Sequence, residues 1–171
     1  MLLIRKETEK DYNAIKEVNN QAFSQAIEGN IIDKIRISDP KALSLVATLE
    51  DKVVGHIFFS SAWIHEKPEI KNGMGLAPMA VLPKFQKQGI GCSLINEGIR
   101  ILKQQSVPFI IVLGLANYYP KFGFETASKH GLKSQWEGVP DEAFMVLILD
   151  ADLMNKITGT AFYREEFNEA V

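Results

Sequence analysis

The spacing of hydrophobic and polar residues changes several times along the chain, and each spacing predicts a different element. Residues 2–8 begin with an apolar run that is typical of a strand. Thr8 and Asp11 have the spacing of a helix capping box, and the apolar residues after them recur every three to four positions. An amphipathic helix is therefore predicted there. Isoleucines four residues apart predict a second helix, which ends before Pro40.

The middle of the chain has the pattern of strands. β-Branched and aromatic residues flank Asp51 and Lys52, which predicts an antiparallel hairpin. A polar loop at residues 65–73 leads into a further strand at 74–83. Residues 109–115 form an unbroken apolar run, as expected of a strand that is covered on both faces.

Residues 91–105 lie between these two strands and have an apolar face at helical spacing. Further along, residues 116–127 predict a short helix or turn that leads into a strand, and two more strands are predicted at 142–150 and 159–167. The pattern is mixed α+β, with an antiparallel first half of the sheet and one β-α-β crossover. We expect a single domain over residues 1–171.

Composition and charge exclude several classes of protein. The net charge of -2 and the lack of a long basic run predict no nucleic-acid binding. The amino-terminal apolar run is too short for a signal peptide and no run reaches the length of a membrane span, so we expect a cytoplasmic protein with no membrane partner. Cys92 is the single cysteine, and the three histidines have no metal-ligand spacing, so no metal site is expected. His56 is expected to be buried and hydrogen-bonded.

Two glycines, Gly89 and Gly91, lie in a polar turn between a predicted strand and a predicted helix. Such a junction binds anions, because the turn and the helix amino terminus present N–H groups and the helix dipole adds positive charge. Lys84 and Lys87 lie beside it. The spacing matches neither a Walker loop nor the dinucleotide fingerprint, in which Leu94 would be a glycine. From spacing alone, a phosphate-binding turn and a purely structural turn are both open.

The segment VLPKFQKQGIG, which contains Gln86, Gly89 and Gly91, resembles the acetyl-CoA pyrophosphate motif of the GNAT superfamily of N-acetyltransferases. The segment YYPKFGF, residues 118–124, is similar to the family's Tyr-x-x-x-Gly-Phe element. The order of elements also matches across nearly the whole chain. This resemblance implies a GNAT-type mixed sheet of six to seven strands, mostly antiparallel with a splayed parallel pair, flanked by about four helices. It also implies acetyl-CoA as the co-substrate and an amine as the acceptor.

The resemblance assigns roles to particular residues. Tyr119 would protonate the departing CoA thiolate. Met79 and Val81 would pair through their backbones with the pantetheine arm, while an amide near Met79 or Ala80 polarises the thioester carbonyl. The pyrophosphate would be held by the turn and the first helical residues, namely Gln86, Lys87, Gln88, Gly89, Ile90, Gly91 and Cys92.

Several of these residues could also have a purely structural role. Tyr119 lies among aromatic residues and could be part of the core. Cys92 is expected to pack in the first helical turn rather than to form an acetyl-cysteine intermediate. Pro78 has no N–H to donate, so it would help to keep the gap between two strands open, or else mark an edge strand or a bulge.

A general base is not evident in the sequence. Glu28 is the candidate, because in this family the segment between the first two helices usually borders the acceptor pocket. Glu66, Glu69, Asp141 and Glu142 are alternatives, and a water relay is another.

The acceptor is either a small-molecule amine or an amine of a protein, and the chain is a monomer or a homodimer. Two other functions remain open, a non-catalytic CoA-binding sensor or interaction module and a transferase of longer acyl chains.

Overall fold

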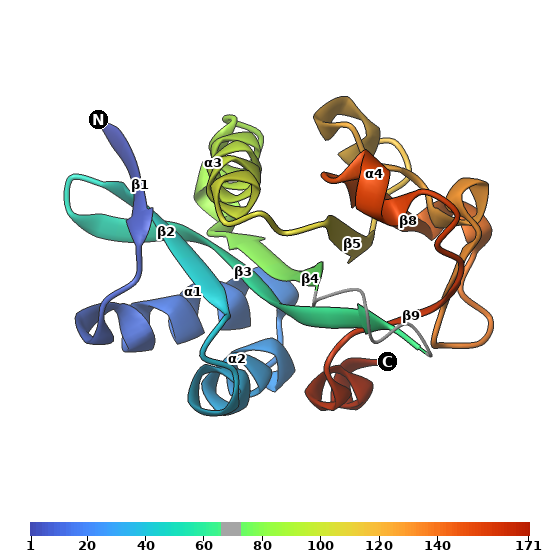
Figure 1. Ribbon diagram of the computed structural model, residues 1–171. Helices are drawn as coiled ribbons and strands as arrows, with labels where there is room; N and C mark the ends of the chain where they lie inside the picture. Colours follow the sequence, from blue (N-terminus) through green and yellow to red (C-terminus); the bar gives the residue numbers. More distant parts are fainter. Residues whose placement is uncertain (66–72) are drawn as a thin grey trace. The chain divides into compact units, whose positions relative to one another are not determined.

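A computed structural model describes residues 1–65 and 73–171 of the chain (Figure 1). The predicted loop at residues 65–73, and with it Glu66 and Glu69, falls almost entirely outside the described residues. The chain divides into two compact units. The first unit is made of Met1–Phe59, Ala77–Arg100 and Glu165–Val171, and the second unit is made of Ser60–Leu76 and Ile101–Arg164.

The described residues contain nine strands. These are β1 (Leu2–Lys6), β2 (Leu43–Leu49), β3 (Lys52–Ile64), β4 (Gly73–Val81), β5 (Phe109–Leu113), β6 (Glu125–Thr126), β7 (Leu132–Ser134), β8 (Phe144–Ile148) and β9 (Gly159–Phe162).

The same described residues form four α-helices and six short 3-10 helices. The α-helices are α1 (Tyr12–Phe23), α2 (Ile27–Ser38), α3 (Ile90–Gln104) and α4 (Ala151–Met154). The 3-10 helices are η1 (Glu9–Asp11), η2 (Pro83–Phe85), η3 (Tyr119–Phe122), η4 (Ala127–His130), η5 (Asp141–Ala143) and η6 (Glu165–Ala170).

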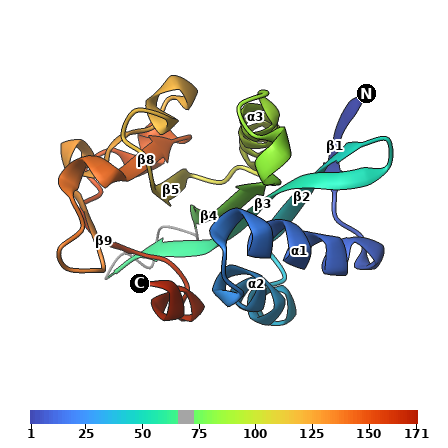
Figure 2. The ribbon, with the colours of Figure 1, turned by 180° about the vertical axis from the view of Figure 1, so that it is seen from behind.

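In the first unit, β1, β2 and β3 pair antiparallel in chain order. The predicted hairpin is present, but its turn is formed by Glu50 and Asp51, one residue earlier than the predicted Asp51 and Lys52. Both turn residues have positive φ, 48° and 64°, as a tight two-residue hairpin requires. Figures 1 and 2 show α1 and α2 on one face of these strands and the beginning of α3 on the other. Leu94 and Ile95 of α3 and Ile35 of α2 are fully buried, so each helix contributes its apolar stripe to a core.

The predicted capping box is present at the start of the first helical segment. The carboxylate of Asp11 accepts the main-chain N–H of Thr8 at 2.7 Å and binds both terminal nitrogens of Arg5 at 2.7 and 2.9 Å. The Arg5 guanidinium, together with the bonds from Thr8, lowers the pKa of Asp11 to about 2. The helix runs through η1 into α1 as the sequence predicts.

In the second unit, β5 lies between two partners. It pairs parallel with β4, from Met74↔Ile110 to Leu76↔Val112, and antiparallel with β8 along its whole length. Residues 109–112 of β5 are fully buried, which confirms the prediction of a strand covered on both faces. β6 pairs with β8, while β9 pairs with both β7 and the end of β3.

The mixed α+β class and the mostly antiparallel sheet are confirmed. The described residues contain more strands than the six to seven that the resemblance implies. β7 is the strand for which no sequence pattern was found, because its three residues are too few to show an alternating pattern. That the chain forms one domain stays a prediction. None of the helices in residues 1–65 and 73–171 combines the length and hydropathy that a membrane span requires.

Candidate functional site

The glycine turn of the first unit, residues 86–89, connects η2 to the start of α3 and is exposed. Gly89 has a φ of 84°, a left-handed conformation that side chains with a Cβ rarely adopt. A Cβ built on Gly89 would meet no described atom within 4 Å, so the backbone here is open to a ligand. Glycine is thus favoured at this position because of the left-handed φ, and not because neighbouring residues would clash with a side chain.

Side chains of the turn fix its shape. The side-chain amide of Gln86 donates to the carbonyl of Val81 at 3.0 Å, and that of Gln88 donates to the carbonyl of Lys84 at 3.3 Å. The hydroxyl of Ser93 donates to the carbonyl of Gly89 at 3.1 Å. The glutamine of the motif therefore ties the turn to the end of β4, a role that the sequence alone does not reveal.

The first turn of α3 has the electrostatics of an anion site. The first main-chain bond of the helix runs from the N–H of Ser93 to the carbonyl of Gly89, so the N–H groups of Ile90 and Gly91 have no acceptor within the helix. The helix has 15 residues and no acidic residue in its first turn, which leaves the positive end of its dipole uncompensated. Cys92 is half-buried in this turn.

The predicted strand residues Met79, Ala80 and Val81 end β4, and only Leu82 and η2 separate them from the glycine turn. Ala80 is buried, whereas Met79 and Val81 are half-buried, as the alternation of a strand requires. Pairing of β4 with β5 covers Met74–Leu76 within the described residues and stops before Pro78. This agrees with the interpretation of Pro78 as a residue that leaves strand pairing incomplete.

Tyr119 of the second unit is the first residue of η3 and is only 8% exposed. Its ring packs edge-on against Tyr118, with centroids 5.2 Å apart, and against Phe124 at 5.7 Å. Burial raises the pKa of Tyr119 to about 12. The phenol is therefore protonated at neutral pH and is able to donate a proton.

Two glycines determine the position of the Tyr119 ring. Gly123 ends η3 in the left-handed region, with a φ of 98°, which turns the chain so that Phe124 enters the core. Gly114 follows β5, and a Cβ there would lie 2.4 Å from Cε2 of the Tyr119 ring. Gly114 was missed by the sequence analysis, because only the packed ring reveals why a side chain is excluded.

Among the described carboxylate candidates for the base, Glu28 is distinct. It lies in the first turn of α2, where Oε1 accepts the side-chain amide of Gln25 at 2.8 Å. Its other oxygen, Oε2, is buried, and no described donor reaches it. Asp141 is exposed and accepts the hydroxyl of Ser128 at 2.9 Å, and Glu142 is exposed too.

His56 is fully buried in the first unit, as predicted, and it serves structure. Its Nδ1 lies 3.2 Å from the side-chain nitrogen of Asn19, and its Nε2 lies 2.8 Å from the hydroxyl of Ser44. Burial, with a smaller contribution from Arg36, lowers the pKa of His56 to about 3, so the imidazole is neutral. Within the described residues, no group of His, Cys, Asp and Glu is placed to hold a metal ion.

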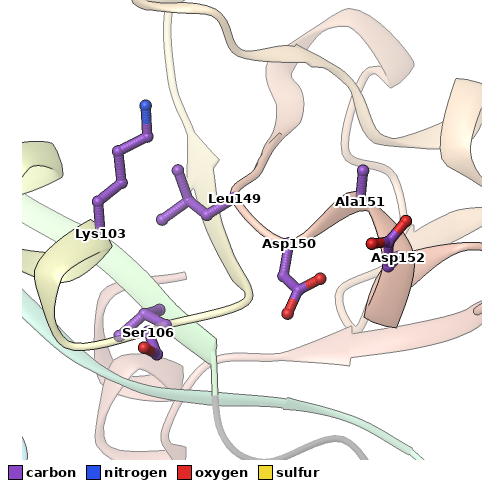
Figure 3. Close-up of a pocket in the computed structure, with 7 residues that line it drawn as sticks. Lys103, Ser106, Leu149, Asp150, Ala151 and Asp152 are labelled. Carbon is purple, nitrogen blue, oxygen red and sulfur yellow. The ribbon is translucent and has the colours of Figure 1, made fainter.

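A hollow of about 370 Å³ in the second unit contains none of the predicted site residues (Figure 3). Lys103 and Ser106 line one side of it, and Leu149, Asp150 and Asp152 line the other. The carboxylate of Asp150 already accepts the N–H of Leu153 at 3.0 Å as the cap of α4. The hollow therefore offers no chemistry that the sequence motifs call for.

The first unit thus contains the glycine turn, the strand residues 79–81 and Glu28, and the second unit contains Tyr119. The first unit therefore presents main-chain N–H groups at the start of a helix, and the second unit contains a buried, protonated phenol.

Comparison with known proteins identifies the family. A family model described as an acetyltransferase (GNAT) domain matches residues 40–126, a range that includes both the glycine turn and Tyr119. The N-acetyltransferase YhbS of Escherichia coli K12 is 33% identical over 168 residues, which cover 98% of this chain and 99% of YhbS. A second Escherichia coli N-acetyltransferase, YjhQ, is 38% identical over 117 residues, 67% of this chain and 65% of YjhQ.

Solved structures agree in fold. The crystal structure of Escherichia coli YhbS in complex with CoA superposes with a TM-score of 0.89 at 32% identity, covering 98% of this chain and 92% of that one. A GNAT acetyltransferase from Brucella melitensis in complex with acetyl-CoA gives a TM-score of 0.80 at 31% identity, covering 98% of both chains. The fold and the enzyme class expected from the two motifs are confirmed, and the chain belongs to the GNAT family of acetyltransferases.

Proposed function

We propose that this protein transfers an acetyl group from acetyl-CoA to the primary amine of a small molecule or a protein. The observation that carries the proposal is the glycine turn, where an open left-handed glycine precedes a 15-residue helix with no acidic residue in its first turn. Such a site suits a pyrophosphate, because it combines main-chain N–H donors with the positive helix end. The similar proteins from Escherichia coli and Brucella melitensis, crystallised with CoA and acetyl-CoA, support the choice of ligand.

In this proposal the donor is bound mainly through the main chain. The N–H groups from Gln88 to Cys92 hold the pyrophosphate, and Gln86 and Lys87 complete the turn around it. Lys84 and Lys87 are exposed beside the turn and add favourable charge. The end of β4, Met79–Val81, binds the pantetheine arm, and an amide at Met79 or Ala80 polarises the thioester carbonyl.

The reaction is a direct attack in a ternary complex. The amine nitrogen forms a bond to the thioester carbonyl carbon, the C–S bond breaks, and the sulfur takes the proton of the Tyr119 hydroxyl. The nitrogen loses its extra proton as the amide forms, and this proton restores the Tyr119 phenol through solvent. Since a thiol has a pKa of about 8.5, the thiolate is already a tolerable leaving group. Proton donation is therefore expected to contribute at the lower end of the roughly 10²–10⁴-fold range of general acids.

The amine must lose a proton before it attacks, since an alkylammonium group has a pKa of about 10. Glu28 is the proposed base. Its Oε2 is buried and has no donor among the described residues, so the carboxylate keeps an unused acceptor that a movement of the side chain would bring to the substrate amine.

The test measures acetyl-CoA-dependent release of free thiol against pools of polyamines, amino acids, aminoglycosides and lysine-bearing peptides. Tyr119→Phe removes the acid and should lower the rate about a hundredfold without changing acetyl-CoA affinity. Tyr118→Phe, the same chemical change one residue earlier, is the matched control. Acetyl-CoA binding without release from any pool would favour a CoA-binding sensor or a longer acyl donor. A protein that does not bind acetyl-CoA at all would refute the proposal.

A further inference from the structure

A second buried tyrosine lies at the end of the paired region of β4 and β5. Tyr163, which follows β9, is 3% exposed. Its hydroxyl donates to the carbonyl of Leu76 on β4 at 3.1 Å and lies 3.3 Å from the carbonyl of Ile111 on β5. Leu76 opposite Val112 is the last pair of these two strands, so a single hydroxyl bonds to both strands where their pairing stops.

Three neighbours hold the tyrosine in this place. A Cβ on Gly75 would lie 2.5 Å from Cε1 of the Tyr163 ring, so the ring occupies the space that a side chain on β4 would fill. The ring of Trp136 stacks on it, with centroids 5.6 Å apart and an interplanar angle of 25°. The side-chain oxygen of Gln135 accepts the main-chain N–H of Tyr163 at 2.6 Å.

The strand that Tyr163 binds leads directly into the residue that packs on Tyr119. Ile111 of β5 accepts from Tyr163, and Gly114 is the first residue after β5. Gly114 lies so close to the Tyr119 ring that a Cβ there would be 2.4 Å from its Cε2. Burial, and secondarily the nearby Tyr119, raises the pKa of Tyr163 well above its ordinary value. The hydroxyl therefore stays protonated and remains a hydrogen-bond donor throughout the working pH range.

We propose that Tyr163 is a positioning residue for acetyl transfer, whose hydroxyl fixes the end of the β4–β5 pair and thereby holds Tyr119 in its productive place. This inference rests on the proposed function, in which Tyr119 is the proton donor. A small displacement of a catalytic group reduces rate steeply, because the reacting atoms must be aligned within a fraction of an ångström. A merely structural tyrosine would stabilise the fold without affecting the rate per folded molecule.

The test is a double-mutant cycle with Tyr163→Phe and Tyr119→Phe. Tyr163→Phe keeps the ring between Gly75 and Trp136 and removes only the hydroxyl. We expect kcat to fall about tenfold while the Kd for CoA changes by less than about twofold. If Tyr163 acts through Tyr119, its removal should have little further effect in the Tyr119→Phe background. Hydrogen exchange of the β5 amides should accelerate in parallel.

Tyr12→Phe is the control, because it makes the same change in the first unit, where the ring stacks under Arg36. Gln135→Ala gives a second route should Tyr163→Phe fail to fold, since it removes only the acceptor of the Tyr163 N–H, and the same fall in kcat is expected. A kcat within twofold of the parent, or additive effects in the cycle, would overturn the inference. A parent protein that binds no acetyl-CoA would instead refute the proposed function itself.

Discussion

The glycine turn before α3 and the tyrosine cluster after β5, namely Tyr118, Tyr119 and Phe124, have different physical properties. The turn is exposed, it presents main-chain N–H groups, and the bonds that shape it join residues at most five apart in sequence. In the cluster, the proposed proton donor is a side chain that is 8% exposed, and its position depends on Gly114 and Phe124. Substitutions in the turn should therefore act on binding, and substitutions in the cluster should act on rate.

The largest effect is expected from Gly89→Val. The φ of 84° is strained for any residue with a Cβ and most for a β-branched one, and the added side chain would stand where the pyrophosphate approaches the backbone. We expect the affinity for acetyl-CoA, measured by titration calorimetry, to fall at least about 100-fold, which corresponds to about 2.7 kcal/mol.

Gly138→Val is the matched control for this substitution. Gly138 has a φ of 77° and, like Gly89, would place a Cβ within 4 Å of no described atom, but it lies outside the turn. It should lower thermal stability through the same backbone strain and leave the affinity for acetyl-CoA unchanged. Equal losses of affinity in both variants would mean that strain alone accounts for the Gly89 result.

The same difference explains what the sequence could and could not predict. The helix at α3, the hairpin near Asp51 and the capping box at Asp11 follow from residues close in sequence, and all were predicted, the hairpin turn one residue too late. Gly114 and Tyr163 were missed. The hydroxyl of Tyr163 bonds to Leu76 and Ile111, which are distant in sequence, and the closeness of Gly114 to the Tyr119 ring depends on how that ring is packed. Their sequence context, a glycine after a strand and a tyrosine after another, is too common to indicate such a role.

Gly114→Ala should have the next largest effect and should act only on the rate. The new Cβ would lie 2.4 Å from Cε2 of Tyr119, so the ring must move. We expect kcat to fall about tenfold with the Kd for acetyl-CoA unchanged. Gly98→Ala produces an equally close clash, 2.4 Å from Cε2 of Phe59, away from any proposed catalytic residue. It should reduce stability by about 1–3 kcal/mol and leave kcat per folded molecule intact.

The pH dependence of kcat provides a smaller test of the cluster. Because burial raises the pKa of Tyr119 to about 12, the acid stays protonated until the pH approaches that value. Deprotonation of Tyr119 should therefore cause no loss of kcat at pH 10, where an exposed phenol would be about half ionised. A fall in kcat with an apparent pKa near 10 in the parent, and its absence in Tyr119→Phe, would show that the phenol is solvated during turnover.

The smallest effect concerns a buried polar group that, on our account, performs no chemistry. His56 is neutral in the folded state, with its pKa lowered to about 3, chiefly by burial, against about 6.5 in the unfolded chain. The stability of the fold with a neutral His56 is fully present above pH 6.5. It is lost as the pH falls toward 3, because only the unfolded state binds a proton at this imidazole in that range. His56→Gln retains amide groups that can bond to Asn19 and Ser44, and it cannot titrate.

The melting temperature of the parent should therefore fall more steeply between pH 6.5 and 4 than that of His56→Gln, by roughly 6–12 °C over the range. Other acid-sensitive groups such as Asp11 are common to both proteins, so the difference in slope isolates the imidazole. At pH 7.5 the two proteins should acetylate at the same rate. A loss of kcat in His56→Gln would instead mean that the hydrogen bonds of His56 support catalysis. The reaction rate would then depend on residues outside the tyrosine cluster as well.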